Sequence, residues 1–205
     1  MVDVTDDFTS SNFALLQNEA EWSLGLVGIA HYGNAIYGYS TIGGYPFCYW
    51  SADSFTADQY SKGLLTNIHG SKPHGVAVHV QPSASQNLYG YVGTTGASQI
   101  IEKVSGSTST ILGSLTAFSN NDTIELQAEV SGGTTTLTAF INDVEVNSTT
   151  DTSFTSGSPG VVFWGDAGTQ YGITTWWGGD LAGGGGPTFV AAWAAGSNII
   201  IGMNK

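Results

Sequence analysis

The sequence predicts an all-β protein built as an antiparallel sandwich of two sheets. Three observations support this: apolar and polar residues alternate over many short segments, glycine is abundant (29 of 205 residues), and Ser and Thr dominate the polar positions. Such alternation gives a strand one buried and one wet face. Helix patterns are scarce, and a sandwich of this length commonly folds as one domain.

The clearest pattern is a meander of strands over residues 122–146, DTIELQAEVSGGTTTLTAFINDVEV. In its first strand Glu125, Gln127 and Glu129 alternate with apolar residues, which predicts these three on the wet face. The SGG and ND pairs that follow tolerate the positive φ angles of tight turns. Hairpins cannot bury their own apolar face, so a second sheet must cover it.

The other strands are expected at regular intervals with Ser-Gly-rich turns between them. They span residues 22–26, 59–68, 75–81, 88–93, 99–104, 110–117, 161–164 and 171–177, after a first edge strand within residues 1–21. The run 161–164 (VVFW) is expected to be buried on both faces. Because neighbours on a strand point oppositely, one of Trp176 and Trp177 fills the sandwich and the other lies outside, under a loop or against a partner.

These segments resemble a known superfamily. The meander, D-x-[apolar]-x-[apolar]-x-[AV]-x-V-x-G-x-T-x-[apolar], is similar to the back sheet of concanavalin A-like and laminin-G-like jelly-roll domains. FTADQYSKGLLTNI, GVAVHVQ and LYGYVG resemble its middle strands, and DDF with GITTWWGGDL resembles its paired first and last strands. The resemblance covers residues 5–182 and implies a jelly roll. Such domains bind sugars, cleave glycans or serve as structural modules, so the fold alone does not choose.

The C-terminal residues form a separate feature. We expect the jelly roll over residues 1–182, a Gly-rich linker at 183–187 and an extended apolar arm at 188–205. An exposed arm would aggregate, so it should dock, either on its own domain or on a neighbouring subunit by strand addition. We favour the neighbour, and the ending AAWAAGSNIIIG also resembles C-terminal segments of phage structural proteins. The expected partner-binding residues are Phe189, Val190, Trp193, Ile199, Ile200 and Ile201.

Charge and cysteine content exclude several partners. Sixteen carboxylates face four lysines and no arginine, for a formal net charge of −12. This balance argues against nucleic acid and anionic lipid. No apolar run reaches the ~20 residues that span a bilayer, and the N-terminal residues lack the pattern of a secretory signal. Cys48 is the only cysteine, so the fold should hold without an intrachain disulfide.

A sugar-binding platform is the main ligand hypothesis. If the strands at 75–81 and 88–93 turn His79, Tyr89 and Tyr91 to the open side of the sheet, these side chains form a platform on which sugars stack. The Tyr-rich stretch 31–50, which contains Tyr37 and Tyr39, has two interpretations: strands packed by aromatics, or a sugar-stacking loop.

Catalysis and metal binding have weaker support. The Glu-x-Asp-x-x-Glu and Glu-x-Asp-x-Glu strands of the glucanase branch are absent, and Glu125 and Glu129 would lie about 13 Å apart on one face, too far for glycoside hydrolysis. A cross-strand pair of Glu102 with Glu125 stays open. The four histidines lack zinc spacing, so no metal site is predicted. Calcium, frequent in the superfamily, is left open at residues 120–122 and 165–168, which also suit turns.

The sequence therefore predicts a non-enzyme without a cofactor. Our first hypothesis is a phage virion protein, a capsid decoration protein that forms homo-oligomers and contacts other virion proteins through its arm. Such a protein is made in the host cytoplasm and located in the virion. The alternative is a lectin-like adhesion module that recognises host-surface glycans.

Overall fold

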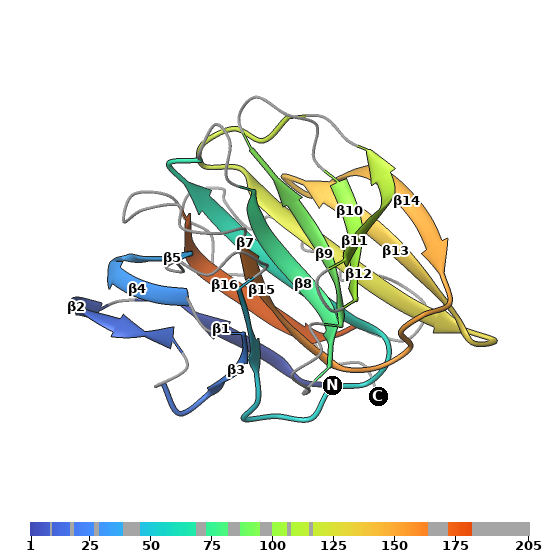
Figure 1. Cartoon of the computed structure of the whole chain (residues 1–205), viewed down its shortest axis with the longest axis horizontal. Helices are drawn as coiled ribbons and strands as arrows, with labels where there is room; N and C mark the ends of the chain where they lie inside the picture. The colour runs from blue at the N-terminus through green and yellow to red at the C-terminus, as the bar shows by residue number, and fades with distance from the viewer. Residues whose placement is uncertain are drawn as a thin grey trace, which may run out of the picture.

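Two facing antiparallel sheets make up the protein, as predicted (Figure 1). The computed structural model describes residues 1–8, 10–16, 19–26, 29–38, 46–68, 73–81, 87–94, 100–105, 108–114, 117–163 and 172–181. Over these ranges the chain forms sixteen strands. None of these ranges contains a helix with the length and apolar character needed to cross a membrane.

One sheet has nine strands, in the order β14-β13-β12-β7-β16-β5-β4-β2, with β1 paired to β16. Its strands are β1 (Asp3–Asp6), β2 (Ser10–Leu15), β4 (Ile29–Gly33), β5 (Ala35–Gly38), β7 (Gln59–Thr66), β12 (Thr123–Ser131), β13 (Thr134–Ile141), β14 (Val144–Asp151) and β16 (Gly172–Asp180). The pairing of β1 with β16 confirms the predicted meeting of the first and last strands. The meander β12-β13-β14 is also confirmed, with positive φ at Gly132, Gly133, Asn142 and Asp143.

The other sheet has seven strands, in the order β11-β10-β9-β8-β15-β6-β3. They are β3 (Trp22–Leu26), β6 (Phe47–Trp50), β8 (His74–Val80), β9 (Leu88–Gly93), β10 (Ile100–Ser105), β11 (Thr108–Ser114) and β15 (Ser158–Phe163). In both sheets the centre joins strands far apart in sequence, since β7 pairs with β16 and β8 with β15. The centre of each sheet is therefore complete only when a strand from the C-terminal part of the chain, β15 or β16, has paired there.

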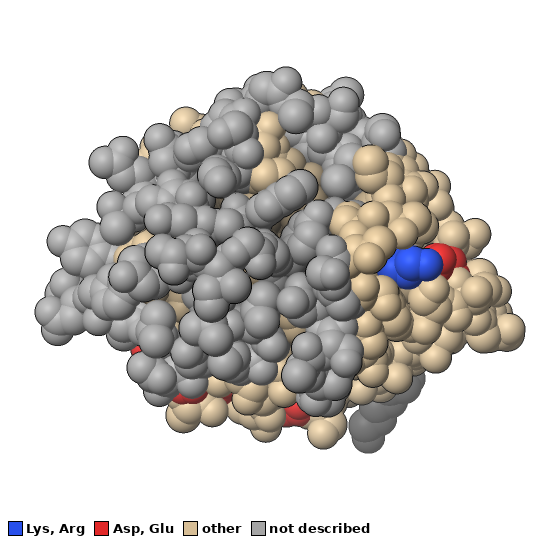
Figure 2. All heavy atoms as spheres, viewed as in Figure 1, with Lys and Arg blue, Asp and Glu red and all other residues tan. Residues whose placement is uncertain are grey.

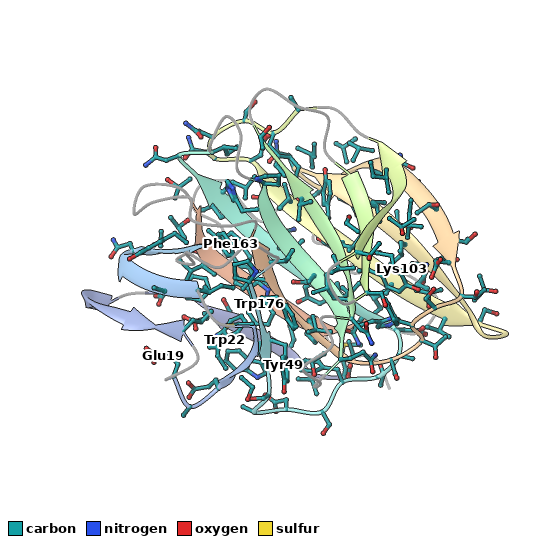
Figure 3. All side chains as sticks on the ribbon, viewed as in Figure 1. Glu19, Trp22, Tyr49, Lys103, Phe163 and Trp176 are labelled. Carbon is teal, nitrogen blue, oxygen red and sulfur yellow. The ribbon has the colours of Figure 1, made fainter. Side chains whose placement is uncertain are left out.

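The space between the sheets is filled by apolar side chains from both of them, including three tryptophans. The ring centroids of Trp22 and Trp176 are 4.7 Å apart, and Trp50 stacks on Trp176 at 5.6 Å (Figure 3). The buried indole Nε1 of Trp176 donates to Ser61 Oγ at 2.8 Å, which satisfies its one polar group. Trp176 is thus the inward member of the doublet, as the alternation requires.

A second apolar cluster lies on the outer face of the seven-stranded sheet, and we name it the outer cluster. Its side chains come from that sheet alone, and each is at most 2% exposed. Register places them opposite the core: Val161 pairs with Val76 in the interior, whereas the next residue, Val162, points outward. The members are Phe47, Ala77, Val80, Leu88, Val92, Val104 and Val162.

Candidate functional site

A row of side chains crosses the outer face of the nine-stranded sheet. Trp177 lies opposite Lys62, Lys62 opposite Glu125, and Glu125 opposite Phe140. Directly opposed residues share a face, and the adjacent residues Trp176 and Ile124 are in the core. These four residues therefore face outward, and we call them the transverse row.

The centre of the transverse row is an ion-pair network. Lys62 Nζ lies 3.3 Å from Glu125 Oε2 and 2.5 Å from Asp143 Oδ1, and Gln127 Nε2 donates to Glu125 Oε1 at 2.6 Å. The side chain of Lys62 is 13% exposed and that of Glu125 only 6%, against 65% for Asp143. Glu125 is therefore buried, contrary to the predicted wet position, whereas Glu129 is exposed as expected. A mostly buried ion pair such as Lys62 with Glu125 interacts more strongly than an ion pair that is fully exposed to water.

Aromatic side chains stand at both ends of the row. Trp177 and Phe140 are each half-buried, so part of each ring meets solvent. They sit three strand spacings apart, roughly 14 Å. Next to the row, Tyr60 is buried and donates its hydroxyl proton to the Asp3 carboxylate. Burial, together with the bond and charge of Asp3, raises the pKa of Tyr60, so the phenol stays protonated. The face thus offers rings for apolar surfaces and charged or amide groups for hydroxyls.

The structure buries the predicted platform residues Tyr37, Tyr89 and Tyr91 instead. Tyr89 and Tyr91 are fully buried, and Tyr37 is 1% exposed. The physical reason is register: Tyr91 pairs with Val76 and Tyr89 with Val78, and paired residues share a face, which here is the core face. The prediction of an open tyrosine platform was wrong. Tyr39 lies outside the described residues.

His79 is buried as well, at a bulge in β8. Its φ of 51° marks the irregularity, and the pairing with β15 shifts between Ser158 and Gly160. The ring lies between two backbone carbonyls, with Nε2 2.7 Å from Ala57 O and Nδ1 3.1 Å from Phe154 O. Burial lowers the pKa of the imidazole, although these carbonyls act in the opposite sense. His79 does neighbour Tyr89, at 6.0 Å between ring centroids, but on the buried side.

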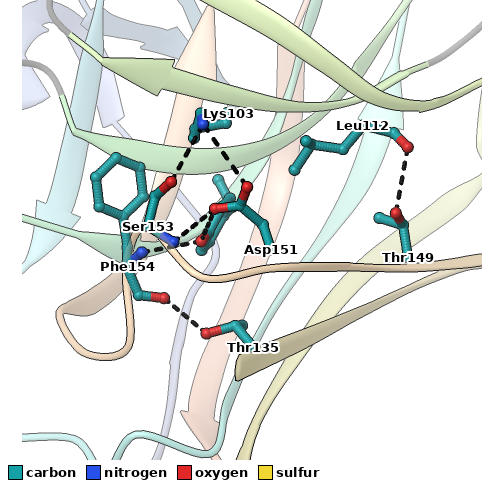
Figure 4. A network of polar contacts seen from close by, with 8 residues as sticks. Lys103, Leu112, Thr135, Thr149, Asp151, Ser153 and Phe154 are labelled. Atoms are coloured by element: carbon teal, nitrogen blue, oxygen red, sulfur yellow. Dashed lines mark hydrogen bonds and ion pairs between the residues drawn. The ribbon is translucent and has the colours of Figure 1, made fainter. Parts of the chain in front are cut away.

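Tyr89 belongs to a polar network that fixes the turn after β14 (Figure 4). Its hydroxyl donates to Asp151 Oδ1 at 2.6 Å and accepts from Phe154 N at 2.9 Å. Asp151 also accepts from Ser153 N at 2.7 Å and lies 3.6 Å from Lys103 Nζ. Burial acts to raise the pKa of Asp151, but the bonds from Tyr89 and Ser153 and the Lys103 charge outweigh it and lower that pKa. These contacts stabilise the turn after β14 against the seven-stranded sheet.

Among the described residues, the glutamates considered for hydrolysis do not form a catalytic pair. Glu102 on β10 and Glu125 on β12 belong to different sheets, so the cross-strand pair left open by the sequence does not form. Glu125 and Asp143 both bind the Lys62 ammonium, which makes them an ion-pair network and not the open pair that flanks a glycosidic bond. Burial raises the pKa of the Cys48 thiol to about 12, so this thiol is unreactive near neutral pH.

The residues considered for calcium serve as turn formers where they are described. Asp122 accepts from Ser119 N at 2.6 Å and from Asn142 Nδ2 at 2.9 Å, and Asn120 Oδ1 accepts from Ile68 N at 2.7 Å. These side-chain oxygens thus accept hydrogen bonds that stabilise the turn, and they are not arranged around one point as calcium ligands are. Over the described ranges no three His, Cys, Asp or Glu side chains gather as metal ligands. Residues 165–168 lie outside the described part of the chain.

Part of the transverse row was visible in the sequence. The Trp176-Trp177 doublet predicted one outward tryptophan, and the structure confirms Trp177 in that place. Its neighbours were missed because Lys62 and Glu125 are 63 positions apart, and only the pairing of β7 with β12 brings them together. The arm residues 188–205 lie outside the described ranges, so their predicted role stays a prediction.

Comparison with known proteins identifies the fold. No protein-family model matches the chain, and no curated protein matches it. Among solved structures, the carbohydrate-binding module CBM66 from Bacillus subtilis superposes with a TM-score of 0.55 at 17% identity, covering 82% of this chain and 97% of that one. The exoplasmic/lumenal domain of VIP36, bound to Ca2+ and Man3GlcNAc, gives 0.52 at 12% identity and 90% of each chain.

A third solved structure, the carbohydrate recognition domain of Emp47p, gives a TM-score of 0.50 at 10% identity, covering 79% of this chain and 89% of that one. At these identities the likeness concerns the fold alone. It confirms the predicted all-β, two-sheet jelly-roll sandwich, of the kind found in lectins and carbohydrate-binding modules.

Proposed function

We propose that the protein is a non-catalytic carbohydrate-binding module that holds a glycan on the outer face of the nine-stranded sheet. The observation that carries this proposal is the transverse row. Two half-buried aromatic side chains, Trp177 and Phe140, enclose the charged pair of Lys62 and Glu125. Sugars present apolar C–H faces and polar hydroxyls together, so a site for them needs both kinds of group.

The arrangement suits an extended ligand. At roughly 14 Å between the strands of Trp177 and Phe140, the row is long enough for a few linked sugar rings. The ammonium of Lys62 donates hydrogen bonds, the carboxylate of Glu125 accepts them, and the amide of Gln127 does both. The ion pairs of Glu125 and Asp143 with Lys62 support binding over hydrolysis as the role of this face. Three of the solved structures with this fold are named for carbohydrate binding or carry a glycan.

A glycan array followed by calorimetry on the best ligand tests the proposal. Trp177→Ala should weaken binding ten- to hundredfold, because it removes the stacking surface. Trp177→Phe should keep most of the affinity, and Gln127→Ala should cost less than Trp177→Ala. All three variants should retain the wild-type circular-dichroism spectrum, since none of the altered side chains is in the core.

Ile111→Ala is the matched control, because Ile111 is an exposed apolar side chain on the other sheet, 61% accessible. It should bind as the wild type does. Absence of saturable binding across the array would contradict glycan binding altogether. Binding that survives Trp177→Ala would move the site away from the transverse row.

Residence on a virus particle is our second candidate. It is favoured by the ending AAWAAGSNIIIG, which resembles C-terminal segments of phage structural proteins, and by a net charge of −12 suited to a crowded assembly. A virion protein that grips host-surface glycans would combine both candidates. Immunogold labelling of purified particles tests it: a label on the shell or tail would support this location, and particles free of label would contradict it.

A further inference from the structure

The outer cluster needs a third layer of protein. Its seven side chains belong to one sheet, and each is at most 2% exposed. Removal of large apolar side chains from water is favourable, so this face would be unstable if it were exposed to solvent. All sixteen described strands belong to the two sheets, and over the described ranges none is stacked on this face. In Figure 2, most of the described atoms on the near face belong to uncharged residues; basic and acidic atoms meet at the right, and a few acidic atoms lie along the lower edge.

The sequence outside the described ranges contains one segment with matching chemistry. Residues 188–205, TFVAAWAAGSNIIIGMNK, carry aromatic and branched apolar residues and one charged side chain, Lys205. The other stretches outside the described ranges are shorter and contain more polar residues or glycine, such as PSASQ at 82–86, TGASQ at 95–99, WGDAGTQY at 164–171 and YSTIGGY at 39–45, which carries two tyrosines and one isoleucine. Burial of an apolar face requires an apolar partner surface, and the C-terminal segment supplies the largest one.

The last described residue, Leu181, lies at the end of the sandwich that is close to the outer cluster. Leu181 N donates to Asp58 O at 2.9 Å, immediately beside Gln59. Gln59 bridges to the other sheet, since its Nε2 donates to Gly157 O at 2.9 Å and its Oε1 accepts from His79 N at 3.2 Å. His79 precedes Val80, a member of the outer cluster. The exit of the chain is therefore at the end of the sheet where the outer cluster begins.

The linker is long enough to reach the cluster. Residues 182–187 span up to roughly 20 Å when extended, against about 10 Å between two packed sheets. The five strands that contribute to the cluster are about 19 Å wide at 4.8 Å per strand, and an 18-residue segment spans about 27 Å even as a helix. A segment from the same molecule thus reaches the face without help from a neighbour.

We propose that residues 188–205 of the same chain cover the outer cluster and complete the protein as a three-layer structure. In this arrangement Phe189, Trp193 and Ile199–Ile201 exclude water from the outer face of the seven-stranded sheet. The hydrogen bonds that connect Leu181 through Asp58 and Gln59 to His79 favour the protein's own sheet over that of a neighbouring subunit. This inference does not depend on glycan binding, which uses the opposite sheet.

Hydrogen exchange and dye binding on the full-length chain test the proposal. In the wild type, amides within 188–205 should exchange at least tenfold more slowly than expected for an unstructured peptide, equally at micromolar and at hundredfold higher concentration. The double variant W193D/I200D should bind an apolar-surface dye at least threefold more than the wild type. The control Asn198→Asp introduces the same charge at a polar position of the segment and should change little.

Three outcomes would overturn the inference. Unprotected amides in 188–205, or no rise in dye binding by the double variant, would mean that other residues cover the outer cluster. Protection that appears only at high concentration, together with a dimer or larger species in sedimentation, would place the segment on a second copy. Because exchange is measured on the unmodified protein, the test holds even where the double variant fails to fold.

Discussion

The two outer faces of this sandwich differ in chemistry although both belong to β-sheets over one core. The nine-stranded sheet presents the transverse row, with charges and half-buried rings. The seven-stranded sheet presents the outer cluster, in which every member is apolar and buried. A two-layer sandwich normally keeps both outer faces wet. The difference teaches that one outer face is partly exposed to solvent, whereas the other is buried.

The same difference appears in the pattern of apolar and polar residues along individual strands. In β12 the buried Ile124, Leu126 and Ala128 alternate with polar residues, as in a strand with one wet face. In β15, Val161, Val162 and Phe163 are all buried, so apolar side chains point to both sides. A continuous apolar run is typical of a strand that is covered twice.

Paired substitutions on the two faces should give the largest contrast. Val162→Asp, on the outer cluster, buries an unpaired charge and should cost more than about 4 kcal/mol of unfolding free energy or prevent folding. Thr138→Asp lies on the other outer face, where the side chain is half-buried, and should cost less than about 1 kcal/mol. Urea denaturation followed by circular dichroism measures both.

A graded pair protects this comparison if the charged variant does not fold. Val162→Ala should cost about 2 kcal/mol, because it leaves a cavity in a packed layer, and Thr138→Ala should cost under about 0.5 kcal/mol. Equal costs at the two positions would mean that the outer cluster is not a true interior, and the contrast between the faces would fail.

The tryptophan doublet gives the next contrast, between the core and the ligand face. Trp176→Ala removes the ring that packs on Trp22 and Trp50 and should cost about 3–5 kcal/mol. Trp177→Ala should cost less than about 1 kcal/mol while weakening glycan binding. Thermal unfolding should show a drop of roughly 10 °C for the first variant and little change for the second. A large drop for both would mean that Trp177 has a structural role.

The sequence predicted the positions of the strands better than it predicted which side chains point inward or outward. Alternation and turn residues located the meander and most strands, because they depend on neighbours in sequence. The continuous run at 161–164 also predicted a strand covered on both sides; this is confirmed for residues 161–163, and Trp164 lies outside the described residues. The sequence pattern alone does not give the register between neighbouring strands. Register decides which side chains of two paired strands lie on the same face of the sheet.

The tyrosines of β9 illustrate that limit. Alternation correctly placed Tyr89 and Tyr91 together on one face, but it does not tell whether that face points to the core or to the outside. The bulge at His79 also breaks the alternation of β8, since it moves Val80 away from Val76 and Val78 and into the outer cluster. Neither the pairing of β8 with β9 nor a bulge at a histidine has a sequence signal as plain as a Gly turn.

The bulge at His79 supports the last and smallest prediction, because it is where β8 exchanges its two faces. Since burial lowers the folded-state pKa of His79, the unfolded chain, with a value near ~6.5, binds more protons in that region of pH. Stability is therefore full above about pH 6.5 and falls as the pH drops through that value. Asn tolerates positive φ, so His79→Asn should keep the bulge while flattening the change in unfolding free energy between pH 7.5 and 5.5. An unchanged slope in the variant would show that the imidazole titrates alike in both states, and the carbonyls of Ala57 and Phe154 would then offset its burial.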